Sequence, residues 1–125
     1  MKIYLAAAFS RRAEMEGCAD IIKEAGHEVT ARWVYGGETG LNREQIALLD
    51  LEDVDKADTV VSFTYARGTL HTGGGRHVEF GYGLAKGKRL AVIGEREHVF
   101  HHHPSVETFN NLAEWLTHVE IIVES

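Results

Sequence analysis

Short apolar segments alternate with helical patterns along most of the chain. Buried strands are predicted over residues 2–8, 27–34, 58–64 and 89–94, with a short fifth strand over residues 105–109. Helices are predicted over residues 10–26, 42–57, 76–86 and 110–124. Strands that alternate with helices form a parallel sheet with helices on both faces, and right-handed crossovers leave few ways to connect it.

Five strands in 125 residues fit one arrangement well. We expect a single α/β domain over residues 1–125, a flavodoxin-like three-layer sandwich with a five-stranded parallel sheet in the order 2-1-3-4-5. In such sheets, ligands bind beyond the carboxyl ends of the strands, beside the first strand. Residues 6–12, residues 64–75 and the loop after the fourth strand are expected at that edge.

Composition excludes several classes of partner. The net charge of −6 argues against polymeric nucleic acid as a partner, although it allows a local cationic pocket for one phosphate. No apolar run approaches the length of a membrane span and no signal peptide is recognised, so we expect no membrane partner. The single cysteine, Cys18, excludes an intrachain disulfide and favours a cytoplasmic location.

Glu79 is the first candidate for chemistry because it lies near the start of a predicted helix, after the glycines at 73–75. The N–H groups and dipole of a helix N-terminus would hold its carboxylate ionised, as a glycosidase-type nucleophile requires. An acid in the first turn also stabilises a helix without doing any chemistry. Gly81 and Gly83 favour the nucleophile, because each glycine inside a helix costs roughly 1 kcal/mol and needs a reason such as close packing or ligand access.

Asp50 and Tyr4 are the second and third candidates. Asp50 falls on a largely apolar helical stripe, where partial burial would raise its pKa as a general acid requires. Alternatively, the helix breaks near Asp50 and the carboxylate caps the next turn. In either case, most of the acidic run from Asp50 to Asp58 is expected to form a solvated face. Tyr4 is either a core tyrosine or a phenol that hydrogen-bonds the nucleophile.

The segment "FSRR" combines a serine and two arginines with the free N–H groups of a predicted helix start. This combination suits an anion, although an N-cap serine followed by solvated arginines is an equally simple interpretation. The run His101–His103 lacks standard metal-ligand spacing, so no metal site is expected. The candidate substrate-binding residues are Phe9, Ser10, Arg11, Arg12, Gly73, Gly75 and His77.

Three segments together resemble the nucleoside 2-deoxyribosyltransferase superfamily. They are "IYLAAAFS", "LDLEDVDKADTVVSF" and "GGGRHVEFGYGLAKGKRLAVIG", in that order. The superfamily contains deoxyribosyltransferases, 2'-deoxynucleoside 5'-monophosphate N-hydrolases and CMP N-glycosidases. The resemblance implies that Glu79 is the nucleophile, that Asp50 is the general acid, and that Tyr4 orients Glu79. It also implies that no metal or organic cofactor takes part.

The chain departs from the family pattern at two places, and the second bears on how the 5' end of the sugar is held. Ala7 and Ala8 replace a Gly-Pro pair, and the histidine-rich segment "HVFHHHP" stands where deoxyribosyltransferases place an asparagine that reaches a neighbouring subunit. These histidines, together with the arginines of "FSRR" where a 5'-phosphate could dock, lead us to expect cleavage of the N-glycosidic bond of a (deoxy)nucleoside 5'-monophosphate through a covalent glycosyl-glutamate. The alternatives are base exchange by a deoxyribosyltransferase and a non-catalytic nucleotide-binding module. The resemblance further implies a homodimer or larger assembly with sites near the interface.

Overall fold

The computed structural model describes residues 1–65 and 73–124, with only the backbone described beyond residue 121. Its sheet has five parallel strands in the order β2-β1-β3-β4-β5, which confirms the predicted fold class and strand order. The strands are β1 (Lys2–Ala6), β2 (Glu28–Val29), β3 (Thr59–Phe63), β4 (Arg89–Ile93) and β5 (Val106–Phe109).

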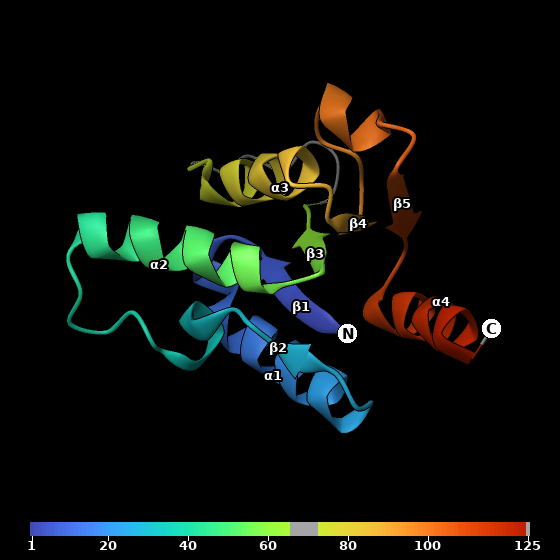
Figure 1. The fold of residues 1–125 in the computed structure, drawn as a ribbon, viewed down its shortest axis with the longest axis horizontal. Helices are drawn as coiled ribbons and strands as arrows, with labels where there is room; N and C mark the ends of the chain where they lie inside the picture. The colour runs from blue at the N-terminus through green and yellow to red at the C-terminus, as the bar shows by residue number, and fades with distance from the viewer. Residues whose placement is uncertain (66–72, 125) are drawn as a thin grey trace.

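The helices cover both faces of this sheet, with α2 and α3 on one side and α1 and α4 on the other (Figure 1). Three short 3-10 turns, η1 to η3, lie in the connections. The bounds are η1 (Phe9–Arg11), α1 (Arg12–Glu24), η2 (Arg32–Tyr35), α2 (Arg43–Lys56), α3 (Gly75–Ala85), η3 (Val99–His102) and α4 (Leu112–Glu124). None of the helices in the described ranges has both the length and the apolar content needed to cross a bilayer.

The two central strands form the middle of the core. Every residue of β3 is buried, and so is every residue of β1 except Lys2. Burial on both faces explains why these segments read as continuous apolar runs rather than as alternating ones. The carboxyl ends of β1 and β3 are neighbours, so the loops that follow them meet at one edge.

The second predicted strand is much shorter than expected. Only Glu28–Val29 pairs with β1, and the chain then turns into η2 instead of continuing as a strand. Trp33 and Val34 are nevertheless buried, and the Trp33 indole N–H donates to the Leu5 carbonyl at 2.9 Å. The apolar pattern was therefore a sign of burial, which a 3-10 turn packed over α1 provides as well as a strand does.

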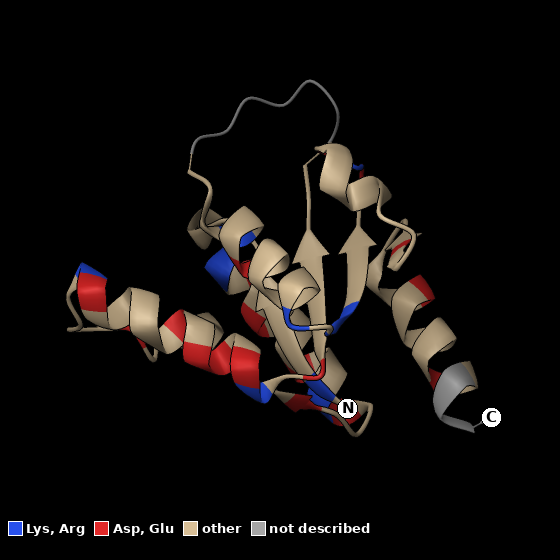
Figure 2. Ribbon diagram, turned by 45° about the horizontal axis from the view of Figure 1, so that its top comes forward, with Lys and Arg blue, Asp and Glu red and all other residues tan. Residues whose placement is uncertain are grey.

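Helix α2 runs without a break from Arg43 to Lys56, so the alternative of a helix that ends near Asp50 is wrong. Asn42 begins it with a capping box, in which the Gln45 N–H donates to Asn42 Oδ1 and Gln45 Oε1 accepts from the Asn42 N–H. Figure 2 shows acidic residues in bands along this helix.

The expectation that the other acids of this segment form a solvated face is wrong for Asp53. Its side chain is 1% exposed, and it accepts the Arg32 backbone N–H at 3.0 Å and forms an ion pair with the Arg32 guanidinium at 2.8 Å. The pair fastens α2 to η2, and it thereby fixes one wall of the site described below.

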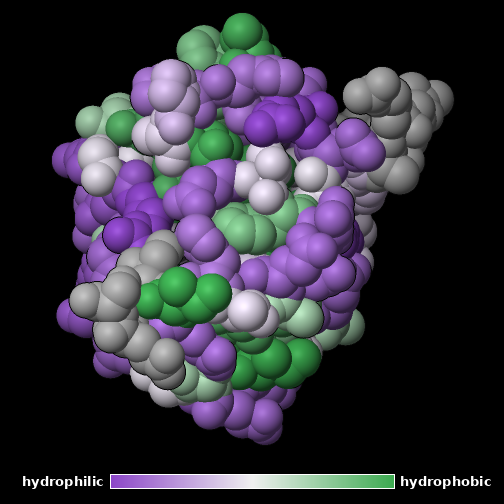
Figure 3. Space-filling model, turned by 90° about the vertical axis from the view of Figure 1, so that its right-hand side faces the viewer, coloured by the Kyte–Doolittle hydropathy of each residue, from purple (hydrophilic) through white to green (hydrophobic). Residues whose placement is uncertain are grey.

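The face formed by β5 and α4 offers little to an apolar partner. Figure 3 shows it as mostly hydrophilic, with hydrophobic side chains in separate spots. Trp115 and Val119 of α4 are buried against the sheet, as its helical periodicity predicts.

Candidate active site

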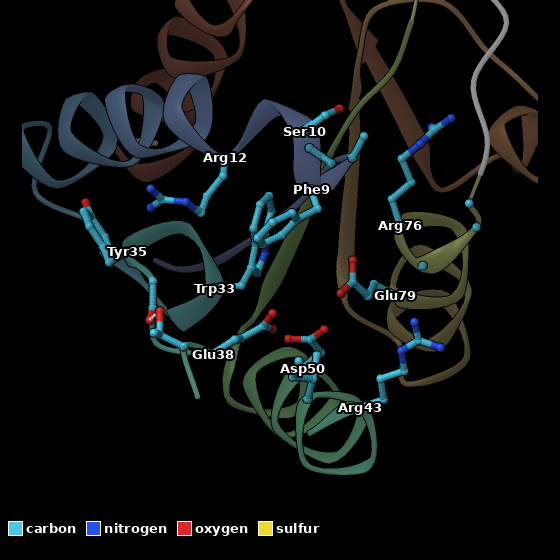
Figure 4. Close-up of a pocket in the computed structure, with 18 residues that line it drawn as sticks. Phe9, Ser10, Arg12, Trp33, Tyr35, Glu38, Arg43, Asp50, Arg76 and Glu79 are labelled. Carbon is cyan, nitrogen blue, oxygen red and sulfur yellow. Dashed lines mark hydrogen bonds between the residues drawn. The ribbon is translucent and has the colours of Figure 1, made fainter. Parts of the chain in front are cut away.

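A cavity of about 1100 Å³ opens at the carboxyl edge of the sheet, where the sequence predicts a ligand. Its walls come from the turn after β1, from η2 and the loop that follows it, from α2, and from the first turns of α3 (Figure 4). The residues that line the cavity include Phe9, Ser10, Arg12, Trp33, Tyr35, Glu38, Arg43, Asp50, Gly73, Gly75, Arg76 and Glu79.

Glu79 and Tyr4 meet in this cavity. Tyr4 is fully buried in β1, and its hydroxyl donates a hydrogen bond to Glu79 Oε2. Both interpretations of Tyr4 therefore hold at once, since it is a core residue whose phenol contacts the candidate nucleophile. The bond fixes the Glu79 carboxyl and leaves its other oxygen for a reacting atom.

Glu79 differs from the expectation in one respect. It is the fifth residue of α3, beyond the free N–H groups of the first turn, and it is 9% exposed. Burial raises the pKa of Glu79 to about 8, with a smaller contribution from Asp50, while the Tyr4 hydrogen bond lowers it. The prediction of a carboxylate held ionised by the helix N-terminus is thus corrected, because desolvation outweighs the helix end at this depth.

Asp50 projects from α2 into the same cavity and points toward Glu38 (Figure 4). Burial is the main reason that the pKa of Asp50 rises to about 8, and a hydrogen bond with the Glu38 carboxyl is the next. The pKa of Asp50 is thus raised, as predicted for this residue, although no sequence pattern pointed to Glu38. Asp50 and the buried Glu79 thus place the candidate acid and the candidate nucleophile in one cavity.

The structure brings most of the predicted binding residues to the cavity. Five of them line it, namely Phe9, Ser10, Arg12, Gly73 and Gly75. Arg11 does not line it, because its guanidinium pairs with Glu14 at 2.6 Å and donates to the Thr64 carbonyl at 3.2 Å. The helix begins at Arg12 and has no side-chain cap, so Ser10 lies in η1 and is not an N-cap.

Arg76 is a residue that the sequence did not single out. It is 4% exposed, lines the cavity, and forms a two-pronged ion pair with Glu97 from the loop after β4. An arginine three residues before the candidate nucleophile in "GGGRHVE" is a visible signal, but its acidic partner lies 21 residues away along the chain. Two aromatic residues, Trp33 and Tyr35, also line the cavity.

His77 is not among the cavity-lining residues and belongs to a separate cluster. His77, His98 and His101 offer ring nitrogens within 4.8 Å of one another, and His77 Nδ1 lies 3.1 Å from His98 Nε2. Burial lowers the pKa of the fully buried His101 to about 4, so this imidazole is neutral.

This cluster is a poor metal site among the described residues. His101 Nδ1 accepts the Glu97 backbone N–H at 3.0 Å, so the ring proton must sit on Nε2. A metal on Nε2 would require the proton to move to Nδ1, where it would face the Glu97 N–H. The hydrogen bonds suit a structural brace between α3 and η3 better than a ligand set.

Part of the predicted ligand-binding edge, residues 66–72, lies outside the described residues.

Comparisons with known proteins support the fold. No family model and no curated protein sequence matches the chain. Among solved structures, a CMP N-glycosidase of Clostridium botulinum, BcmB, is similar with a TM-score of 0.66 and 22% identity, over 97% of this chain and 99% of that one.

Two transferases are similar as well. A 2-deoxyribosyltransferase of Bacillus psychrosaccharolyticus has a TM-score of 0.68 and 18% identity over 93% of this chain and 90% of that one. A Leishmania mexicana 2-desoxiribosyltransferase has a TM-score of 0.60 and 15% identity over 89% and 75%. The chain therefore shares its fold, over nearly its whole length, with proteins named as a CMP N-glycosidase and as 2-deoxyribosyltransferases.

Proposed function

We propose that the protein cleaves the N-glycosidic bond of a (deoxy)nucleoside 5'-monophosphate and releases the free base. The observation that carries the proposal is the buried Glu79 carboxyl, hydrogen-bonded by Tyr4, in one cavity with the protonated Asp50. The fold neighbours supply a second line of support, because one is named a CMP N-glycosidase and two are named 2-deoxyribosyltransferases.

In the first step, the ionised Glu79 carboxylate attacks C1' of the sugar. The C1'–N bond breaks, its electron pair goes to the base nitrogen, and Asp50 gives its proton to the departing base. Tyr4 keeps Glu79 Oε2 in place, so that the other carboxylate oxygen forms the ester bond to C1'. The product of this step is a glycosyl ester of Glu79 and a neutral free base.

In the second step, water attacks C1' and the ester bond to Glu79 breaks. The Asp50 carboxylate, which lost its proton in the first step, takes one from that water, and the protein returns to its starting state. Two carboxyl groups that act in this sequence give retention at C1'. No metal or organic cofactor is required by these steps.

The 5'-phosphate is proposed to lie between the η1 turn and the start of α3. No side chain among the described residues caps the N-terminus of α3, and the positive end of the helix dipole there favours an anion. Ser10 and Arg12 line the same cavity, and Arg43 points from α2 toward the side on which Glu79 lies (Figure 4). These positions favour a monophosphate over an uncharged nucleoside.

The second candidate is a deoxyribosyltransferase, in which a second base replaces water in the second step. The cavity volume of about 1100 Å³ supports this alternative, because a cavity of this size leaves room for a second base beside a bound sugar. A non-catalytic nucleotide-binding module is a third reading of the same fold. The Glu79 carboxyl, held by Tyr4 and accompanied by Asp50, argues against a binding module. Nucleotide binding alone does not require a buried carboxyl beside a protonated one.

The test is chromatography of free base released from nucleosides and their 5'-monophosphates, with and without a second base as acceptor. The proposal expects release from monophosphates in water alone. Base exchange that depends on an acceptor would replace it with the transferase, and no release from any substrate would leave the binding module.

Glu79→Gln tests the nucleophile in the same assay. We expect turnover to fall by at least about 1,000-fold while nucleotide binding persists, because the amide keeps the shape but cannot form the ester. Glu24→Gln, at an exposed site at the end of α1, is the matched control and should keep full activity. Unchanged turnover in Glu79→Gln would remove Glu79 from the mechanism.

The homodimeric or larger assembly that the family resemblance implies stays a prediction. Light scattering coupled to size-exclusion chromatography would measure it, and a monomeric mass with full activity would contradict it.

A further inference from the structure

Glu38 and Asp50 form a carboxyl–carboxyl pair on the wall of the cavity. They come from different elements, since Asp50 belongs to α2 and Glu38 to the loop between η2 and α2. Both side chains line the cavity, and their carboxyl groups point toward one another (Figure 4).

The loop holds Glu38 in this position. Its turns are closed by hydrogen bonds from the Gly37 N–H to the Arg32 carbonyl at 2.9 Å and from the Leu41 N–H to the Glu38 carbonyl at 3.1 Å. A Cβ on Gly37 would lie 2.9 Å from the Arg32 carbonyl oxygen, so the close approach of the two backbones requires glycine. Glu38 is therefore presented to the cavity by a defined backbone, although it lies outside any helix or strand.

The pair is short of hydrogen-bond partners. Glu38 Oε1 and Asp50 Oδ1 are buried, and neither accepts an N–H or hydroxyl proton from the residues that the structure describes. Buried carboxyl oxygens without donors are costly, so a site that keeps two of them together is one where a ligand supplies the missing partners. Asp50 donates to a ring nitrogen of that ligand in the proposed reaction, which leaves Glu38 facing the neighbouring atom of the same ring.

A protonated Asp50 beside the Glu38 carboxyl presents one donor and one acceptor. Adenine offers the complementary pair at N7 and its 6-amino group, and cytosine offers it at N3 and its 4-amino group. Hypoxanthine and uracil place a carbonyl oxygen where these bases have the amine. That oxygen would face the Glu38 carboxylate without a proton between them.

We propose that Glu38 and Asp50 select a base that carries an exocyclic amine beside a ring-nitrogen acceptor, with Glu38 accepting the amine and Asp50 donating to the ring nitrogen. This inference rests on the proposed function and narrows its substrate to nucleotides of adenine or cytosine. Glu38 is a specificity-determining residue in this scheme, and the bond that breaks lies elsewhere on the base.

Binding to Glu79→Gln tests the inference without turnover. Titration calorimetry would compare AMP with IMP and CMP with UMP, since each pair differs only at the edge in question, and the 2'-deoxy forms would be run alongside. We expect the amino member of at least one pair to bind about 10- to 100-fold more tightly than its oxo partner. The pair that shows the difference identifies the base.

Glu38→Gln in the same background should remove most of this preference, because its amide N–H can donate to a carbonyl. Glu44→Gln, an exposed glutamate on the first turn of α2, is the matched control and should leave the preference unchanged. Glu38→Ala serves as a second variant and should also abolish the preference. Thermal unfolding would verify that each variant is folded.

The outcomes separate this inference from the proposed function. Equal binding of amino and oxo nucleotides, tighter binding of the oxo members, no measurable binding of any of them, or a preference that survives both Glu38 variants would each overturn it. None of these results depends on base release. Failure of wild-type protein to release base, with the amino preference intact, would instead overturn the proposed reaction alone.

Discussion

At the scale of single residues, the protonation states of Glu79 and Asp50 decide the activity. Attack requires Glu79 to be ionised and base departure requires Asp50 to be protonated, yet the pKa of each group is raised to about 8. The correctly charged pair is therefore most populated near pH 8. We expect a bell-shaped profile of kcat/KM with its maximum near that pH, measured by base release across the pH range.

Tyr4→Phe tests the assignment of the acidic limb of that profile. The Tyr4 hydroxyl lowers the pKa of Glu79 by stabilising its ionised form, so its removal should shift the acidic limb to higher pH and reduce kcat. A variant that loses activity equally at every pH would show that Tyr4 acts only through packing.

Arg12 and Arg11 form a natural pair for testing the phosphate site. Arg12 lines the cavity, whereas Arg11 pairs with Glu14 outside it. We expect Arg12→Gln to raise KM for a monophosphate by about 10-fold or more with little effect on the corresponding nucleoside, since a phosphate contact is charge-assisted. Arg11→Gln should not change the ratio of the two KM values, and an equal effect of both variants would place the phosphate elsewhere.

At the scale of elements, the two glycines inside α3 have different reasons to be there. A Cβ on Gly83 would lie 2.8 Å from Val60 Cγ2 in the buried strand β3, whereas a Cβ on exposed Gly81 would meet nothing within 4 Å. We expect Gly83→Ala to destabilise the protein by roughly 1–3 kcal/mol through overpacking and Gly81→Ala to stabilise it by roughly 0.5–1 kcal/mol. Urea denaturation of both variants measures the contrast, and equal effects would contradict the packing argument.

The ion pair between Asp53 and Arg32 allows a similar comparison of two substitutions in α2. Asp53 is 1% exposed and holds both the backbone and the guanidinium of Arg32, so Asp53→Ala should cost roughly 3 kcal/mol in the free energy of unfolding. Glu52→Ala, one residue earlier and exposed, should cost less than about 1 kcal/mol. Similar losses in the two variants would show that burial of Asp53 adds nothing.

The elements that could be predicted from the sequence are those whose pattern has one physical meaning. Alternating strands and helices fixed the sheet order, and the apolar stripe around Asp50 placed this carboxyl in a partly buried position. The second strand, expected over residues 27–34, was predicted too long because buried Trp33 and Val34 look alike in a strand and in a 3-10 turn. Glu38, Arg76 and the histidine cluster were missed because their partners lie on other elements, and no local spacing encodes such contacts.

At the scale of the whole molecule, the buried carboxyl groups of the site lower the free energy of unfolding. Between the pKa of a free glutamate, 4.5, and about 8, Glu79 keeps its proton in the folded state and loses it in the unfolded state. The folded state binds more protons in this window, so the free energy of unfolding falls as the pH rises through it. Asp50, whose pKa is raised to the same region, adds to the effect in the same direction but is less buried.

Glu79→Gln should therefore stabilise the whole protein in a pH-dependent way. The amide removes the titration and still accepts the Tyr4 hydroxyl, so the variant should resemble wild type at about pH 4 and exceed it by on the order of a few kcal/mol at pH 8 and above. Thermal and urea unfolding at both ends of the window measure the difference, with Glu24→Gln as the control that should track wild type throughout. If the curves of Glu79→Gln and wild type run parallel across the window, Glu79 titrates alike in the folded and unfolded states, and the pH optimum predicted for the reaction loses its basis as well.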